Sequence, residues 1–254
     1  DKIFSNEIKM SGVNSINWAR IIAQSVYYFY CYFLVDDNKK PINFSVPTGN
    51  FGDVYAGYLA KKMGLPINKL IVATNQNDIL HRAITKGTYD VKKVSETISP
   101  SMDIQIASNF ERLIYDLNNC NDTKTIDAMN DISEKGKYII EKENLDKINI
   151  DFLSSRMNED EVLNTIKTIY KKFNIILDPH SAIGYGAFDK VNLKGNNVVL
   201  ATAHPCKFPD AIEKAINFKS ELPDELSFIL DEKENYDIIE NNLDKIKQHI
   251  KKRI

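Results

Sequence analysis

The chain has 254 residues, of which 43% are hydrophobic and 27% are charged, so it is long and apolar enough to bury a sizeable core. Its 33 basic side chains are offset by 35 acidic ones, for a formal net charge of −2. This balance gives no electrostatic reason to expect a nucleic acid or an anionic membrane as a partner. The three cysteines, Cys31, Cys120 and Cys206, lie far apart and match no metal-binding spacing, which is typical of free thiols in a reducing cytoplasm.

The N-terminus carries no initiator methionine and no signal-peptide pattern, because the chain opens on Asp1. We therefore expect the natural polypeptide to begin further upstream. The most apolar stretch, 21–35, is too short to span a bilayer and contains Gln24 and Ser25. Its pattern favours a buried helix over 17–34, with apolar side chains on nearly all faces.

Strands and helices alternate in the first half of the chain. Gly64 and Pro66 are stop signals that end one of the predicted helices. The order strand, glycine turn, helix, strand is that of a βαβ unit, and it predicts an α/β fold with a mainly parallel sheet. The expected elements are a strand over 43–46, a turn over 47–53, a helix over 54–63, a strand over 70–74 and a helix over 78–85.

The second half repeats this order after a polar stretch. Residues 118–160 are rich in Asn, Asp and Lys, and they predict helical pieces without a convincing strand. A helix over 179–191 follows, with Asp178 as its N-cap. The remaining expected elements are a strand over 197–203, a helix over 209–218 and a tail helix with Ile239, Leu243, Ile246 and Ile250 on one face.

The turn over 47–53 is the strongest local indication of a binding site. It reads Pro-Thr-Gly-Asn-Phe-Gly-Asp, and it lies between a predicted strand and a predicted helix. Two glycines three residues apart let the backbone turn tightly, and the positive end of the next helix suits a phosphate group. The same pattern also fits an ordinary turn with one left-handed glycine. The residues alone leave both interpretations open.

Two further segments are candidates for ligand contacts. Asn14, Ser15 and Arg20 place amide, hydroxyl and guanidinium donors at a helix start, where they could bind a second anion or only cap the helix. Thr202 follows a buried strand at its carboxyl end, where ligands of parallel sheets gather, although such threonines often bond nearby backbone instead. The four histidines, His81, His180, His204 and His249, share no motif and are predicted to be structural.

Seven sequence blocks occur in one order over residues 12–209, and together they resemble threonine synthase of the bacterial and fungal type. Seven blocks in order are far more specific than any one of them. Ser181 and Cys206 depart from the family pattern, in which Thr and Ala are expected. The blocks are NSINWARI, VPTGNFGDVYAGYLAKKMGLP, NDILHR, SPSMDI, SNFERL, LDPHSA and ATAHPCKFP.

The resemblance implies a fold-type-II pyridoxal phosphate enzyme of amino-acid biosynthesis, with a three-layer αβα large domain. Such a lyase converts O-phosphohomoserine and water into threonine and phosphate. By this resemblance, Thr202 would bond the pyridine nitrogen of the cofactor, and Asn14, Ser15 and Arg20 would hold the substrate phosphate. The cofactor phosphate would lie in the loop formed by Gly49, Asn50, Phe51, Gly52 and Asp53.

The family's Schiff-base lysine and its Ser-Gly-Asp-Thr-Gly type loop precede the first matching block, and nothing before Asn14 resembles them. We therefore assign no catalytic lysine and no metal, and we expect this chain alone to be inactive without an N-terminal segment of the same enzyme. Residues 1–13 are predicted to be a remnant of the preceding small domain, and 14–254 the large domain. A non-catalytic phosphate- or cofactor-binding fragment and another fold-type-II enzyme, such as a dehydratase, are the alternatives.

Overall fold

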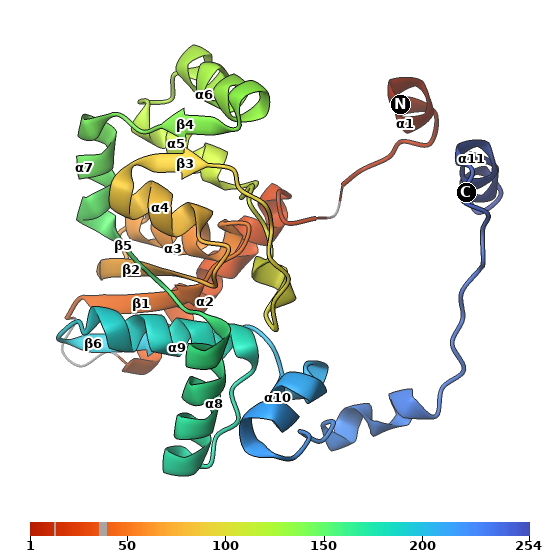
Figure 1. Cartoon of the computed structure of the whole chain (residues 1–254). Helices are drawn as coiled ribbons and strands as arrows, with labels where there is room; N and C mark the ends of the chain where they lie inside the picture. The colour runs from red at the N-terminus through yellow and green to blue at the C-terminus, as the bar shows by residue number, and fades with distance from the viewer. Residues whose placement is uncertain (13, 36–39) are drawn as a thin grey trace. The chain divides into compact units, whose positions relative to one another are not determined.

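The computed structural model describes residues 1–12, 14–35 and 40–254. They form two compact units, one of residues 15–220 and one that joins residues 1–14 to residues 221–254 (Figure 1). The N-terminal segment and the C-terminal tail, which the sequence predictions assigned to different domains, therefore lie in the same unit.

The smaller unit is built around two short helices, α1 (Lys2–Glu7) and α11 (Leu243–Lys251), with a 3-10 segment η3 (Asp224–Leu230). Lys251 Nζ lies 2.5 Å from Glu7 Oε1 and joins the two helices. Ile239 was predicted to lie on the tail helix, but the helix α11 begins only at Leu243, so that part of the prediction is wrong.

The larger unit contains a four-stranded parallel sheet in the order β5-β2-β1-β6. A separate antiparallel pair joins β3 (Thr88–Asp90) to β4 (Lys137–Ile139). The parallel sheet confirms the predicted α/β class. Its strands are β1 (Ile42–Pro47), β2 (Ile67–Thr74), β5 (Phe152–Arg156) and β6 (Asn196–Val199).

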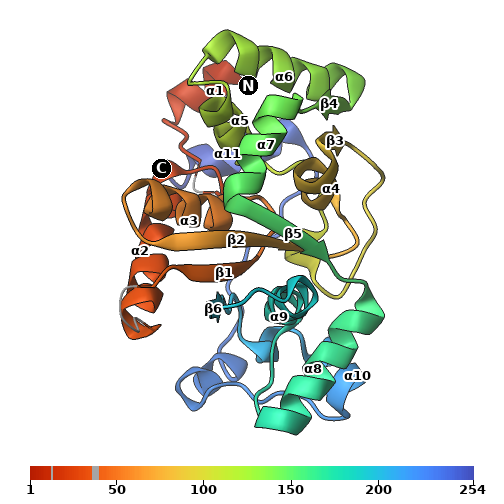
Figure 2. The same cartoon turned by 90° about the vertical axis from the view of Figure 1, so that its left-hand side faces the viewer.

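Helices cover both faces of the sheet, which gives the predicted three layers (Figure 2). Alternate residues of β2 face the two layers: Leu70 and Val72 join one core, and Ile71 and Ala73 join the other. The first core is covered by α2 (Trp18–Val35), α3 (Gly52–Lys62), α4 (Ile79–Lys86) and α5 (Phe110–Leu117). The second is covered by α8 (Glu159–Phe173), α9 (Pro179–Val191) and α10 (Pro209–Ile216).

The structure corrects the prediction for 118–160, where no strand was expected. Both β4 and the sheet strand β5 lie there, after α6 (Asp122–Lys135) and within a segment that also holds α7 (Lys142–Asp151). The strand β5 lies at the edge of the sheet, where polar residues such as Ser154 and Ser155 are tolerated because the strand is only half buried.

The expectation of a buried helix over 17–34 is only partly correct. The helix α2 is present, but it buries a single stripe formed by Ile21, Ser25, Tyr28 and Tyr32. Its opposite face is exposed, with Phe33 at 70% of its maximal accessible surface. A helix that is apolar on nearly all sides does not reveal which side the chain itself covers.

Candidate anion-binding site

The loop between β1 and α3 bends at Phe51, whose φ of 64° is left-handed. The alternative interpretation of this turn assigned that conformation to a glycine. The side chain of Phe51 is fully buried and packs against Phe110 and Phe152, with ring centroids 5.2 and 5.9 Å away. The buried ring stabilises a backbone conformation that a bulky residue rarely adopts. The N-cap residue of α3, Phe51, makes no side-chain cap bond, so it leaves the N–H groups of the first turn to an anion.

Gly49 is required here for a close approach. A Cβ atom at this position would lie 2.4 Å from the carbonyl oxygen of Ser101. Ser101 belongs to the 3-10 turn η1 (Pro100–Met102), and its own N–H donates to His180 Nε2 over 3.3 Å. The loop therefore packs backbone against backbone at this point.

The two segments that the sequence predicted as separate anion sites face the same cavity of about 250 Å³. Ser15 and Arg20 line it from the start of α2, together with Gln24. Asn14 belongs to the other compact unit. The β1–α3 loop contributes the five residues predicted for the cofactor phosphate, Gly49, Asn50, Phe51, Gly52 and Asp53.

Thr202 lies beyond the end of β6, because the strand ends at Val199 and not at 203 as predicted. Its N–H donates to Ser181 Oγ over 3.1 Å, and its side chain is exposed. Thr202 lines a cavity of about 230 Å³ that also contacts Gly49 and Lys207, and a third cavity of about 520 Å³ that also contacts Asp53. These shared residues show that the three cavities adjoin one another.

A buried carboxylate organises the wall that carries Thr202. Asp178 Oδ1 lies 3.0 Å from His180 Nδ1 and accepts the N–H of His180 over 2.9 Å, and Asp178 Oδ2 accepts the hydroxyl of Ser181. Burial alone would raise the pKa of Asp178, but the hydrogen bonds from His180 and Ser181 hold it below its usual range. Asp178 caps α9 as predicted.

The carboxyl group of Asp53 has a raised pKa, in contrast to that of Asp178. Its Oδ1 accepts a hydrogen bond of 3.1 Å from the hydroxyl of Tyr28. Burial nevertheless raises the pKa of Asp53 to about 6, with the Tyr28 bond acting against the shift. A carboxyl that is neutral over part of the physiological range repels a nearby phosphate less than an ordinary aspartate does.

We expect Asp53→Asn to stabilise the chain at neutral pH. The pKa of Asp53 is raised in the folded state, so the unfolded state loses its proton first, and the unfolding free energy falls as pH rises from about 4 to about 6. Asparagine removes this penalty, which is of the order of 2–3 kcal/mol. Urea denaturation should show a gain for the variant that grows from near zero at pH 4 to this size at pH 7. An equal difference at all pH values would contradict the assignment.

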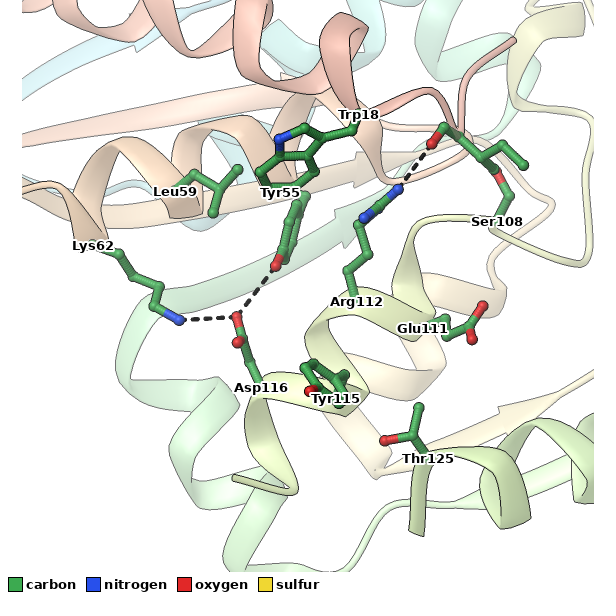
Figure 3. Close-up of a pocket in the computed structure, with 11 residues that line it drawn as sticks. Trp18, Tyr55, Leu59, Lys62, Ser108, Glu111, Arg112, Tyr115, Asp116 and Thr125 are labelled. Atoms are coloured by element: carbon green, nitrogen blue, oxygen red, sulfur yellow. Dashed lines mark hydrogen bonds and ion pairs between the residues drawn. The ribbon is translucent and has the colours of Figure 1, made fainter. Parts of the chain in front are cut away.

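A larger cavity of about 620 Å³ is lined by Ser108, whose hydroxyl lies 3.4 Å from that of Ser15 (Figure 3). On one side the guanidinium of Arg112 lies over the ring of Trp18, 5.2 Å from its centroid. On the other, Asp116 accepts hydrogen bonds from Tyr55 and from Lys62, over 3.3 and 3.1 Å. Lys62 and Asp116 are therefore paired with each other, whereas Arg112 is held by the Trp18 ring and by the carbonyl oxygen of Ile16.

Sequence reasoning missed several residues of this site. Ser101, Ser108 and Lys207 lie inside the recognised blocks but received no role. His180, which was expected to be structural, bonds Asp178 and the N–H of Ser101 through its two ring nitrogens and also lines the cavity beside Thr202. Across the described residues, no group of three or more His, Cys, Asp or Glu side chains could hold a metal ion. Within the same ranges, no helix has the length and apolarity to cross a membrane.

Comparisons with known proteins agree with this architecture. A family model described as threonine synthase, C-terminal, matches residues 181–250. The threonine synthase of Pseudomonas aeruginosa is 41% identical over 253 residues, which cover 98% of this chain and 54% of that protein. The threonine synthase of Saccharomyces cerevisiae is 44% identical, over 89% of this chain and 49% of that protein.

A crystal structure of PLP-bound threonine synthase from Brucella melitensis superposes with a TM-score of 0.96 at 42% identity, over 99% of this chain and 55% of that one. The chain thus spans about half the length of the relatives it matches. It belongs to the threonine synthase family.

Proposed function

We propose that this chain is the cofactor- and substrate-binding part of a threonine synthase, which converts O-phosphohomoserine and water into threonine and phosphate. The observation that carries the proposal is the meeting of two anion-binding segments in one cavity beside Thr202. The reaction needs two phosphate sites, one for the cofactor and one for the substrate. This chain offers the two segments side by side.

The residues fit pyridoxal phosphate. The uncapped N-terminus of α3 and the backbone of the loop at Gly49 and Asn50 would hold its phosphate. Thr202, whose exposed side chain lines the next cavity, would bond the pyridine nitrogen. When bound, the cofactor supplies an electron sink, and the protein's part is to orient it. A neutral hydroxyl partner would leave that nitrogen largely unprotonated.

The substrate phosphate is assigned to the start of α2. Arg20 supplies the positive charge and Ser15 a hydroxyl donor at the same cavity. Asn14 is proposed as a third donor on the strength of the sequence alone. Separating the two phosphates between a helix end and a guanidinium reduces the repulsion between them.

The proposed partner is the part of threonine synthase that this chain does not span, and it would bring the Schiff-base lysine. The exposed face of α2 supports this, because residues 21–35 hold no charged side chain and an apolar face of this kind needs a cover. The side chains on that face are Ile22, Val26, Tyr27, Tyr30, Phe33 and Leu34. The three cysteines, which are free, support a reducing cytoplasm as the compartment.

The test is reconstitution with a polypeptide that supplies the part of threonine synthase that this chain does not span. The mixture should release phosphate from O-phosphohomoserine, whereas the chain alone should not. Arg20→Ala should preserve assembly and cofactor binding but lower kcat/KM by roughly 30- to 1000-fold, the loss of a charge-assisted contact. Phe33→Lys should instead prevent assembly.

Lys62→Ala is the matched control, because Lys62 is a nearby cation that lines the neighbouring cavity and not the proposed phosphate site. It should change kcat/KM little. Phosphate release by the chain alone would contradict the proposal, because it would show that the chain needs no Schiff-base lysine from the part of threonine synthase that it does not span. Unchanged kinetics in Arg20→Ala would show that Arg20 is an ordinary surface residue and does not bind the substrate phosphate.

A further inference from the structure

Asn109 joins the two anion-binding segments. Its side-chain Nδ2 donates to the carbonyl oxygen of Ser15 over 2.8 Å and to the carbonyl oxygen of Asn50 over 3.1 Å. The backbone N–H of Asn109 also donates to Asn50, over 3.1 Å. These bonds span 94 and 59 residues of sequence, so one amide connects the loop before α2 to the loop before α3.

The position of Asn109 in its own helix makes this use of the side chain unusual. Asn109 is the N-cap residue of α5, where asparagine normally accepts a hydrogen bond from the first turn. Here it makes no such cap bond. The side chain is fully buried and is directed instead across the chain to Ser15 and Asn50.

Arg112 holds this amide in place from one turn further along α5. Its Nε donates to Asn109 Oδ1 over 3.1 Å, and its Nη2 donates to the carbonyl oxygen of Ile16 over 2.8 Å. The guanidinium also lies over the ring of Trp18 (Figure 3). Arg112 therefore orients the Asn109 amide, with its oxygen toward the guanidinium and its nitrogen toward the two carbonyls, and it also contacts the start of α2.

We infer that Asn109 is a positioning residue for both phosphate sites, and that it sets the spacing between the Ser15–Arg20 segment and the Asn50–Asp53 loop. This inference rests on the proposed function for the identity of the two ligands, but the connection itself rests on the hydrogen bonds. The helices that follow the two segments also contact each other, because the hydroxyl of Tyr28 in α2 donates to the carbonyl oxygen of Asp53 in α3. Asn109 makes the corresponding connection between the loops that precede the two helices. A buried amide with two donors and one acceptor is suited to this geometry, because it satisfies two carbonyls and a guanidinium at once.

The informative variant is Asn109→Asp, which preserves the shape and the acceptor toward Arg112 but replaces the donor with an acceptor facing two carbonyls. Amide hydrogen exchange, followed by mass spectrometry on the chain, should become at least about tenfold faster in both 15–20 and 49–53. Inorganic phosphate and pyridoxal phosphate, titrated separately, should each bind at least about tenfold more weakly.

Asn144→Asp is the matched control. Asn144 is also a buried amide, and its Nδ2 donates to Asn118 Oδ1 over 3.2 Å in a different part of the same unit. It should destabilise the chain without faster exchange in 15–20 or 49–53. Faster exchange spread evenly over the whole unit in Asn109→Asp, or confined to α5, would overturn the inference. Failure of phosphate to bind the unaltered chain would contradict the proposed function, while the exchange result would still decide the role of Asn109.

Discussion

Replacing Gly49 with alanine should lower the unfolding free energy by roughly 2 kcal/mol and weaken pyridoxal phosphate binding by more than about tenfold. The new Cβ would lie 2.4 Å from the carbonyl oxygen of Ser101, a contact that real Cβ atoms do not make. Ser101 cannot easily withdraw, because its N–H is bonded to His180 and the next residue, Met102, is bonded back to Ser99. The β1–α3 loop must therefore move, and the backbone that we propose binds the cofactor phosphate moves with it. Urea denaturation and a cofactor titration measure the two effects.

Gly52→Ala separates binding from stability. A Cβ at Gly52 would meet Nδ2 of Asn109 at 3.4 Å, an ordinary contact, and Gly52 is the first residue of α3. We expect its unfolding free energy to change by less than about 0.5 kcal/mol. Phosphate binding should still weaken, because the methyl group would occupy the approach to the helix end. If Gly52→Ala were the more destabilising of the two variants, the close approach at Gly49 would not be the reason for the glycine.

Features with local causes could be predicted from the sequence. The helix over 179–191 was placed correctly because Asp178 and Pro179 are adjacent N-terminal signals that act within one turn. The α/β class could be predicted from the order of strands and helices, because most of these elements also have local signals. The strand β5 was missed because its Phe-Leu-Ser-Ser-Arg sequence has little strand preference of its own. Its pairing with β2, more than 75 residues earlier, determines its conformation.

The candidate site also has some features with local causes and others that depend on distant contacts. Each anion-binding segment was predicted from a helix start and its neighbouring donors. That Ser15 and Gly49 face one cavity depends on contacts of Ser101 and Asn109. Both residues lie inside recognised blocks, but sequence spacing does not show what they contact. Lys207 and His180 could not be placed beside Thr202 for a similar reason. Their position follows from how the turn after β6 packs on the start of α9, and sequence spacing does not show this.

The same contacts connect stability to function. Three features hold the backbone of the β1–α3 loop in position, and none of them orients a side chain toward a ligand. They are the left-handed Phe51, the glycine at position 49 and the buried amide of Asn109. The proposed cofactor-phosphate loop would bind through backbone N–H groups and needs such supports, because its geometry depends on the loop conformation and not on rotamers.

Asp178→Ala is expected to have the largest effect on stability, about 3 kcal/mol or more. The variant removes the N-cap of α9 and leaves buried donors of His180 and Ser181 without their acceptor. Its consequences should extend to the ligand site, because Ser181 Oγ accepts the N–H of Thr202 and His180 accepts the N–H of Ser101. Binding of pyridoxal phosphate should therefore weaken as well, even in buffers where the variant is fully folded.

Asn158→Ala provides the comparison, because Asn158 is exposed and caps α8 through a capping box with Glu161. It should cost about 1 kcal/mol and leave cofactor binding unchanged. The pH dependence distinguishes Asp178 further. Its pKa is lowered in the folded state, so its stabilising contribution is present above the ordinary aspartate pKa of about 4 and is lost as pH falls through the folded value. The difference between the unaltered chain and Asp178→Ala should therefore be full at pH 7 and shrink below pH 4, and a difference that stayed constant into acid would show that the lost contacts do not depend on the carboxylate charge.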